Sequence, residues 1–281
     1  TGVIMETLPV DRLVAVLQQH GVQHALAALD GELRALGHQA SGAPWAVASV
    51  FASRGLATLA ITVVGHGGGP LGTPTVLPSG ATPVVVNAGG RGFDQDGNGS
   101  IDSTEGVNAA PPRTVIGSRD GLRQTVVDLM QLVREVEVGM DVDGDGTPDL
   151  DAQRIYYAGQ SFGGIYGTIF LGVEPSLKAG VPNVPGGSIT EIARLGAFRP
   201  LTGIALISRL PSLINVTPNP SGIEFNENMP LRNEPPRINN VAGAMAIQQL
   251  LDRNEWVQQS GNPVSYAERI RKNPLPGHAA K

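Results

Sequence analysis

The chain has 281 residues, of which 41% are hydrophobic and 16% charged, enough apolar material for one large core or two modest ones. A net charge of -5 leaves no basic stripe to neutralise phosphate groups, so nucleic acid is excluded as an expected partner. The absence of cysteine excludes disulfides, thiolate metal sites and a cysteine nucleophile.

The first part of the chain predicts helices followed by one buried strand. Residues 10–36 carry apolar side chains at helical spacing and predict a pair of helices. Residues 44–54 predict another helix, which ends at Gly55, a residue suited to the position just after a helix. The apolar run at residues 56–64 is too short to span a bilayer and predicts a strand.

The middle of the chain predicts an inserted loop region and then a return to regular structure. Residues 66–118 are rich in Gly, Pro, Asn and Asp and predict at most one short strand pair, near residues 82–88. Residues 119–138 predict a helix with an apolar stripe formed by Leu122, Val126, Met130 and Val133. Residues 154–159 predict a strand that a second helix follows directly. This order predicts an α/β fold with a mostly parallel sheet and crossover helices.

The last third of the chain has a different pattern. Residues 177–187 could form one more strand, whereas residues 188–275 alternate helical stretches with turns rich in Pro and Asn. The clearest helical stretch lies at residues 242–259, and no strand is expected after about Leu210. We therefore expect a core over residues 1–187 and a helical, lid-like segment over residues 188–281.

Ser161 is the strongest candidate for a catalytic residue. Together with Gly159 and Gly163 it forms the pattern G-x-S-x-G, with a predicted strand before it and a predicted helix after it. Such a turn needs small residues on both sides of the serine because the backbone is strained there. The helix behind Ser161 presents a positive dipole end, and the backbone N–H of Phe162 would face a developing oxyanion.

At this point the chain resembles the α/β-hydrolase family. The stretch DLDAQRIYYAGQSFGG is similar to the family's entry into its nucleophile strand, and ASRGLATLAITVVGHG to its earlier helix and strand. Among members of the family, the chain looks most like secreted or surface-anchored bacterial lipases and esterases with calcium-type acidic loops. The resemblance covers about residues 37–187 and implies a hydrolase sheet with a serine nucleophile.

The second oxyanion donor has two candidate positions. The string HGGG at residues 66–69 occurs in some esterases, while Gly37 to Ala40 precede a helix and a strand, which is the order of elements in the family. We therefore expect Gln39 or Ala40 to be the donor and residues 66–69 to form a glycine-rich turn beside the site.

The family order requires an acid and then a histidine after the serine. His278 is the only histidine after Ser161, and Asp252 the only aspartate. Asp252 falls within a helical pattern and His278 lies close to Lys281, so both are more typical of surface residues, although His278 is the only candidate base in this order. The resemblance therefore predicts that the chain is part of a longer protein.

Residues 94–105 match the twelve-residue calcium loop. Oxygen-bearing side chains occupy its ligand positions, and Gly99 occupies the sharp turn. The predicted ligands are Asp94, Asp96, Asn98, Ser100, Asp102 and Glu105.

Residues 141–151 repeat this pattern but place Ala152 where the loop needs its last carboxylate, unless Asp151 substitutes for it. The predicted ligands are Asp141, Asp143, Asp145, Thr147 and Asp149. Ca²⁺ at either loop is expected to be structural rather than catalytic.

The leading functional hypothesis is therefore a serine hydrolase of carboxylic esters, a lipase or esterase that forms an acyl-enzyme on Ser161. The alternative is a calcium-stabilised extracellular surface or adhesion module with a non-catalytic fold. Both hypotheses favour an extracellular or cell-surface location, although no signal peptide is visible in the chain. The expected partners are a small-molecule or lipid ester and, for a lipase, the surface of a membrane.

Overall fold

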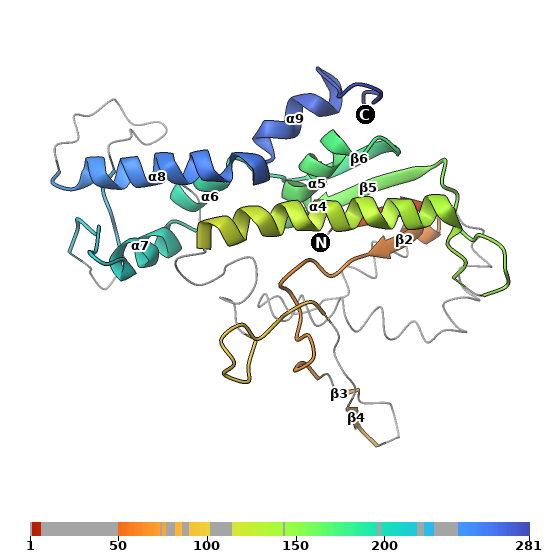
Figure 1. The fold of residues 1–281 in the computed structure, drawn as a ribbon, viewed down its shortest axis with the longest axis horizontal. Helices are drawn as coiled ribbons and strands as arrows, with labels where there is room; N and C mark the ends of the chain where they lie inside the picture. Colours follow the sequence, from red (N-terminus) through yellow and green to blue (C-terminus); the bar gives the residue numbers. More distant parts are fainter. Residues whose placement is uncertain are drawn as a thin grey trace.

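A computed structural model describes residues 2–6, 50–73, 75–76, 82–85, 90–101, 114–142, 144–195, 198–217, 222–227 and 241–281. Within these residues the chain forms a mixed α/β structure in which helices pack on a small sheet (Figure 1). The sheet has the order β2-β1-β5-β6. Its strands are β1 (Gly2–Glu6), β2 (Ala57–Ala60), β5 (Ile155–Gln160) and β6 (Leu177–Asn183). The predicted α/β class is confirmed at this level.

The sheet is mixed rather than mostly parallel in the part of the chain that the structure describes. β5 and β6 are parallel, whereas β1 runs antiparallel to both of its neighbours, with Gly2 opposite Gly159 and Val3 opposite Ala60. No sequence pattern predicted β1, and its insertion between β2 and β5 changes the expected topology. No feature of this sheet establishes a hydrolase fold.

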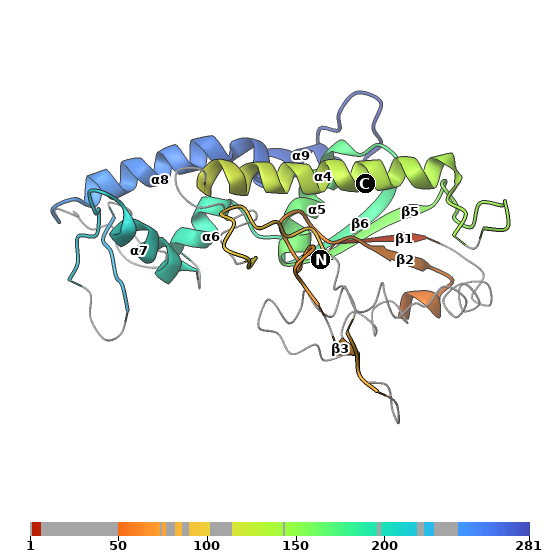
Figure 2. The ribbon, with the colours of Figure 1, turned by 60° about the horizontal axis from the view of Figure 1, so that its bottom comes forward.

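Two helices provide most of the main core. α4 (Thr114–Gly139) presents the predicted apolar stripe, in which Leu122, Val126 and Val133 are buried. α5 (Phe162–Val173) packs against β1, β5 and β6 and also contacts α4. Figure 2 shows α4 running above β1 and β2. The strand residues Ile155 and Tyr157 belong to the same buried cluster as the helix residues.

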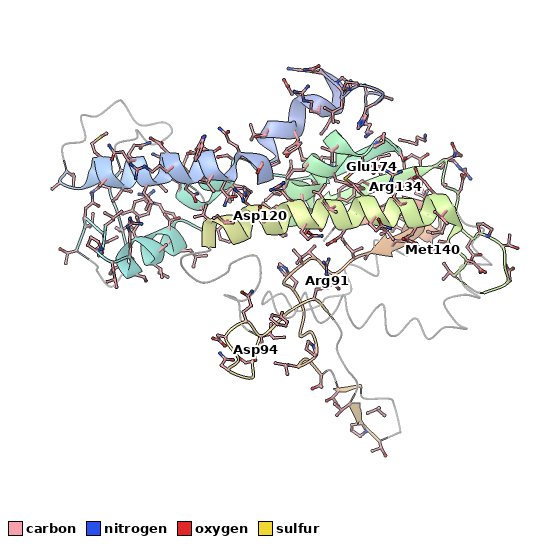
Figure 3. All side chains as sticks on the ribbon, viewed as in Figure 1. Arg91, Asp94, Asp120, Arg134, Met140 and Glu174 are labelled. Atoms are coloured by element: carbon pink, nitrogen blue, oxygen red, sulfur yellow. The ribbon has the colours of Figure 1, made fainter. Side chains whose placement is uncertain are left out.

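An ion pair between a partly exposed arginine and a buried glutamate joins α4 to the end of α5. Glu174 is fully buried, and both of its carboxylate oxygens lie 2.5 Å from Nη2 of Arg134 (Figure 3). The carboxylate raises the pKa of Arg134. Because a buried charge without a partner is very costly, this pair fixes the two helices relative to each other.

Two sequence predictions in the first half of the chain are confirmed. The helix that precedes β2 ends as expected, since Gly55 has φ 73° and Leu56 N–H donates to the carbonyl oxygen of Phe51. One short strand pair lies in the loop region, formed by β3 (Thr75–Val76) and β4 (Val84–Val85). The helical pair predicted at residues 10–36 lies outside the described residues.

The last third of the described chain is helical. It contains α6 (Ile189–Leu195), α7 (Arg199–Ser208), α8 (Ala244–Gln258), the short 3₁₀ helix η1 (Gln259–Gly261) and α9 (Val264–Arg271). A second, smaller core includes Leu206, Phe225, Ile247 and Leu251, while α9 packs against α5. Among the described helices, none combines the length and the apolar character needed to cross a membrane.

Candidate active site at the end of strand β5

Ser161 lies on a strained turn between β5 and α5. Its φ of 54° and ψ of -113° fall outside the regions that L-residues ordinarily occupy, and its side chain is exposed. The Ser161 N–H donates to the carbonyl oxygen of Asn183 at the end of β6, and the Ser161 carbonyl accepts from Ile165. The turn is therefore held by the backbone on both sides.

The hydroxyl of Ser161 is not used to cap the helix. Serine at the start of a helix commonly accepts a hydrogen bond from a backbone N–H of the first turn, but Ser161 makes no such side-chain bond. The N–H groups of the first turn of α5 also have no acceptor within the helix. An exposed hydroxyl thus lies beside backbone donors and a positive dipole end, which together favour an anionic group.

Close packing behind Ser161 explains why glycines surround it. A Cβ at Gly159 would lie 2.4 Å from the carbonyl oxygen of Gly163, and one at Gly164 would lie 2.7 Å from the carbonyl oxygen of Asn183. Neither position has room for a side chain. The expectation that this turn needs small residues therefore has a direct steric cause.

The glycine-rich turn at residues 66–69 lies beside this site. The rings of His66 and Phe162 have centroids 6.1 Å apart, and Phe162 directly follows Ser161 in the chain. Phe162 also packs edge-on against Tyr166 at 5.5 Å. The sequence pattern predicted a glycine-rich turn here but gave no role to the His66 side chain, whose position depends on tertiary packing.

The structure does not bring His278 to Ser161. The tail that contains His278 is anchored through Lys281, whose Nζ donates to the carbonyl oxygens of Leu171 and Glu174 at the far end of α5. Ser161 precedes the other end of this 12-residue helix, which is about 18 Å long at 1.5 Å per residue. Gln39, the predicted second oxyanion donor, lies outside the described residues.

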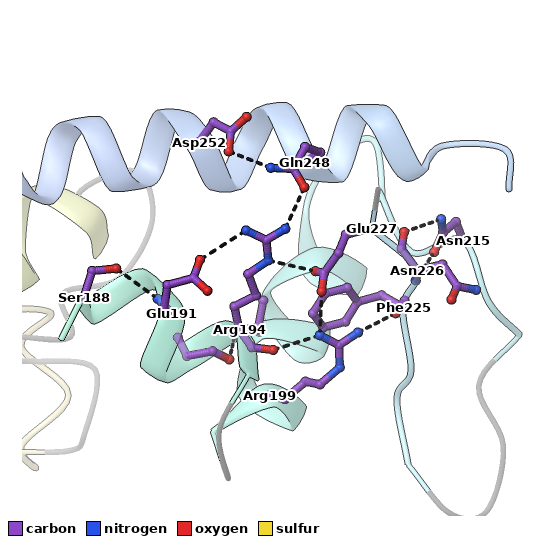
Figure 4. Close-up of polar contacts among 12 residues, drawn as sticks. Ser188, Glu191, Arg194, Arg199, Asn215, Phe225, Asn226, Glu227, Gln248 and Asp252 are labelled. Carbon is purple, nitrogen blue, oxygen red and sulfur yellow. Dashed lines mark hydrogen bonds and ion pairs between the residues drawn. The ribbon is translucent and has the colours of Figure 1, made fainter. Parts of the chain in front are cut away.

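Asp252 belongs to a separate polar cluster in the helical segment (Figure 4). It accepts a hydrogen bond from Gln248 on the same helix, and Gln248 in turn accepts from Arg194 on α6. Arg194 forms an ion pair with Glu227, and the side chains of both residues are only 2% exposed. These contacts connect α6, α8 and residues 222–227. Asp252 thus belongs to a hydrogen-bond network that holds these segments together.

The first acidic loop folds around one carboxylate. Asp94 Oδ1 accepts from the backbone N–H groups of Gly97 and Asn98, and Asp94 Oδ2 accepts from Gly99 (Figure 3). These bonds, that from Gly99 foremost, lower the pKa of Asp94. Asp96 and Asn98 pair with each other, and Ser100 donates to Asn98. The predicted ligands Asp102 and Glu105 lie outside the described residues.

The second acidic loop repeats this arrangement. Asp141 Oδ1 accepts from Gly144 and Asp145, and its Oδ2 accepts from Gly146. Asp145 accepts from the backbone N–H of Thr147, as Asn98 does from that of Ser100 in the first loop.

The remaining predicted ligands of the second loop are less favourably placed. Asp149 is buried and accepts from the backbone N–H of Val142, whereas Asp143 lies outside the described residues. In the described ranges, no three acidic or histidine side chains converge in a way that could hold a metal ion.

Comparison with known proteins gives one family match. Residues 2–64 match the model of the ApbE family, a family of flavin transferases, and this segment is less than a quarter of the 281-residue chain. It contains β1 and β2, so it contributes the two strands on one side of β5. No curated protein and no solved structure matches the chain.

This match corrects the interpretation of the sequence. The resemblance to the α/β-hydrolase family was wrong, as was the assignment to lipases and esterases, because the matched family transfers a flavin group rather than hydrolysing esters. The alternative of a calcium-stabilised adhesion module has no support from the comparisons either. The hydrolase pattern was misleading because a strand, a tight glycine turn and a helix describe a local geometry, and this geometry does not specify a reaction.

Proposed function

We propose that this chain is a flavin transferase that moves FMN from flavin adenine dinucleotide to a hydroxyl group, with Ser161 as the attacking hydroxyl. The observation that carries the proposal is the exposed Ser161 on its strained turn at the start of α5. The family match supports the same reaction class, and β1 of the matched segment pairs directly with β5, which ends beside Ser161.

The proposed chemistry is displacement at phosphorus. The Ser161 oxygen forms a bond to the phosphorus of the FMN half, the bond from that phosphorus to AMP breaks, and AMP leaves. The serine proton passes to a base. In a second displacement, an acceptor hydroxyl takes the FMN phosphoryl group and releases Ser161. The first turn of α5 supports this chemistry because its N–H groups and dipole stabilise the charge on phosphate oxygens.

The test is to incubate the chain with flavin adenine dinucleotide, with and without divalent cations. We expect flavin fluorescence that stays with the denatured protein, together with release of AMP. Ser161→Ala and Ser161→Gly should abolish both signals, and the glycine variant also relieves the positive φ. Ser265→Ala, which removes an exposed hydroxyl from α9, is the matched control. The proposal would be rejected if the Ser161 variants were labelled with flavin as strongly as the unchanged protein, or if the folded protein released no AMP.

We also propose that the two acidic loops bind structural Ca²⁺. The support is that both loops wrap three backbone N–H groups around their first aspartate in the same way. Thr147 and Ser100 occupy equivalent positions in the two loops. An extracellular location would supply Ca²⁺ at the concentrations that such loops need for binding, and this location remains a prediction. Contact with a membrane surface also remains a prediction.

A further inference from the structure

His66 is held in a rigid turn next to the candidate nucleophile. The turn packs against residues 90–92 so closely that a Cβ at Gly92 would lie 2.2 Å from the carbonyl oxygen of Gly67. Arg91 N–H donates to the carbonyl oxygen of His66 at 2.6 Å. The Arg91 side chain in turn forms an ion pair of 2.5 Å with Asp128 on α4. The His66 backbone is thereby tied to the helical core.

The hydrogen bond of the imidazole determines which nitrogen can accept a proton. His66 Nδ1 lies 3.2 Å from the carbonyl oxygen of Val64. A carbonyl oxygen only accepts hydrogen bonds, so Nδ1 carries the hydrogen, and in the neutral ring Nε2 keeps its lone pair. A histidine oriented by a backbone carbonyl in this way is suited to act as a general base.

Ring packing places the imidazole next to the turn that carries Ser161. His66 packs against Phe162, and Phe162 is the residue that follows Ser161. In the described part of the chain, the other histidine is His278, whose tail is anchored at the far end of α5. The charged groups nearest to the turn, Arg91 and Asp128, are already paired with each other.

We infer that His66 is the general base that takes the proton from Ser161 when the hydroxyl attacks. In this step the Ser161 O–H bond breaks, Nε2 of His66 gains the proton, the freed oxygen electron pair forms a bond to the phosphorus, and the bond from phosphorus to the leaving group breaks. The imidazolium then returns the proton to the leaving group. This inference rests on the proposed role of Ser161 as a nucleophile, but the activation of Ser161 does not depend on the identity of the flavin donor.

The experiment measures the rate at which a fluorophosphonate labels Ser161 as a function of pH, since this probe requires an activated serine and no flavin. We expect the rate to rise with pH, because a general base must be unprotonated to accept the serine proton. In His66→Gln this rise should vanish and the rate should fall about 100-fold or more. His66→Ala should recover part of its rate when imidazole is added, which a merely structural role would not explain. His278→Gln is the matched control and should behave like the unchanged protein.

The outcomes separate the inference from the proposed function. Labelling that depends on His66, without any flavin transfer, would support the base and reject the flavin reaction. Flavin transfer to Ser161 that is unchanged in His66→Gln would retain the proposed function and overturn the inference. The inference is also overturned if folded protein shows no labelling of Ser161, or if His66→Gln keeps the original pH profile.

Discussion

Tyr157 donates a hydrogen bond of 2.5 Å from its hydroxyl to the carbonyl oxygen of Gly163, and this contact joins β5 to the first turn of α5 directly behind Ser161. Tyr157 is fully buried, and its burial raises the pKa of the phenol, so the hydroxyl remains protonated and acts as a donor. The helix that carries the candidate oxyanion donors is thus positioned by a side chain from the preceding strand.

Replacing Tyr157 with phenylalanine tests this positioning. We expect Tyr157→Phe to lower the free energy of unfolding by about 1 kcal/mol, the typical contribution of one hydrogen bond, while the aromatic packing against Phe170 remains. The labelling rate of Ser161 should also fall, because the first turn of α5 loses a support. Tyr156→Phe, on the other face of β5, should change neither quantity by more than the error of denaturant unfolding. A Tyr157→Phe variant with unchanged stability and labelling would contradict the role of this bond.

Gly159→Ala tests the steric requirement of the turn. The new Cβ would meet the carbonyl oxygen of Gly163 at 2.4 Å and the hydroxyl of Tyr157 at 2.5 Å, so the strand or the helix must shift. We expect a loss of roughly 3 kcal/mol in the free energy of unfolding and loss of Ser161 labelling. Gly97→Ala places its Cβ in open space at φ 76° and should cost only about 1 kcal/mol of backbone strain. A loss in Gly159→Ala no larger than that in Gly97→Ala would contradict the collision.

The ion pair of Arg194 and Glu227 predicts a strong dependence of stability on one carboxylate. Arg194 Nε lies 3.5 Å from Glu227 Oε2, and Arg199 also pairs with Glu227 while it stacks over Phe225 at 3.8 Å. Glu227→Gln removes the buried carboxylate that Arg194 and Arg199 share, leaves Arg194 its pair with the more exposed Glu191, and should cost roughly 3 kcal/mol. Asp252→Asn, an exposed change in the same cluster, should cost less than about 0.5 kcal/mol.

A double-mutant cycle supplies the second check on this pair. The combined variant Arg194→Met with Glu227→Gln should lose less stability than the sum of the two single variants. The reason is that Arg194→Met removes the positive charge that would lose a carboxylate partner in Glu227→Gln. Additive losses in chemical unfolding would contradict a coupling between the two side chains.

The acidic loops predict that Ca²⁺ raises the thermal stability of the protein. Millimolar Ca²⁺ should raise the melting temperature, and Asp94→Asn and Asp141→Asn should each reduce this shift, since each removes charge from one loop. Asp252→Asn is the control, because Asp252 lies on α8 and in neither loop. A shift that persists in the Asp94 and Asp141 double variant would place the calcium elsewhere.

The sign of the pH dependence follows from Asp94. Backbone hydrogen bonds hold its pKa below the ordinary value of 3.8, so the stabilisation is present above that value and is lost as the pH falls through the lower pKa of the folded state. We therefore expect the calcium-dependent shift to be constant at neutral pH and to disappear in strong acid. Thermal melts across an acidic pH series measure this loss.

The sequence alone determined the local elements around the candidate site. The apolar stripe from Leu122 to Val133 predicted α4, and the order of strand, Gly-x-Ser-x-Gly and helix placed Ser161 on a tight turn between β5 and α5. Gly55 marked the end of the helix before β2. These predictions succeed because periodicity and the backbone requirements of glycine act over a few residues.

The tertiary structure decided what surrounds those elements. β1 was not predicted, and only its pairing between β2 and β5 shows that the sheet is mixed. The position of His66 beside Phe162, and of the His278 tail at the far end of α5, depends on how segments distant in the sequence pack together. Chain order suggested His278 as the partner of Ser161, whereas packing points to His66. Local sequence therefore determined the turn that carries Ser161, but contacts between distant segments decided its neighbours, because side-chain proximity arises from burial and pairing rather than from spacing along the chain.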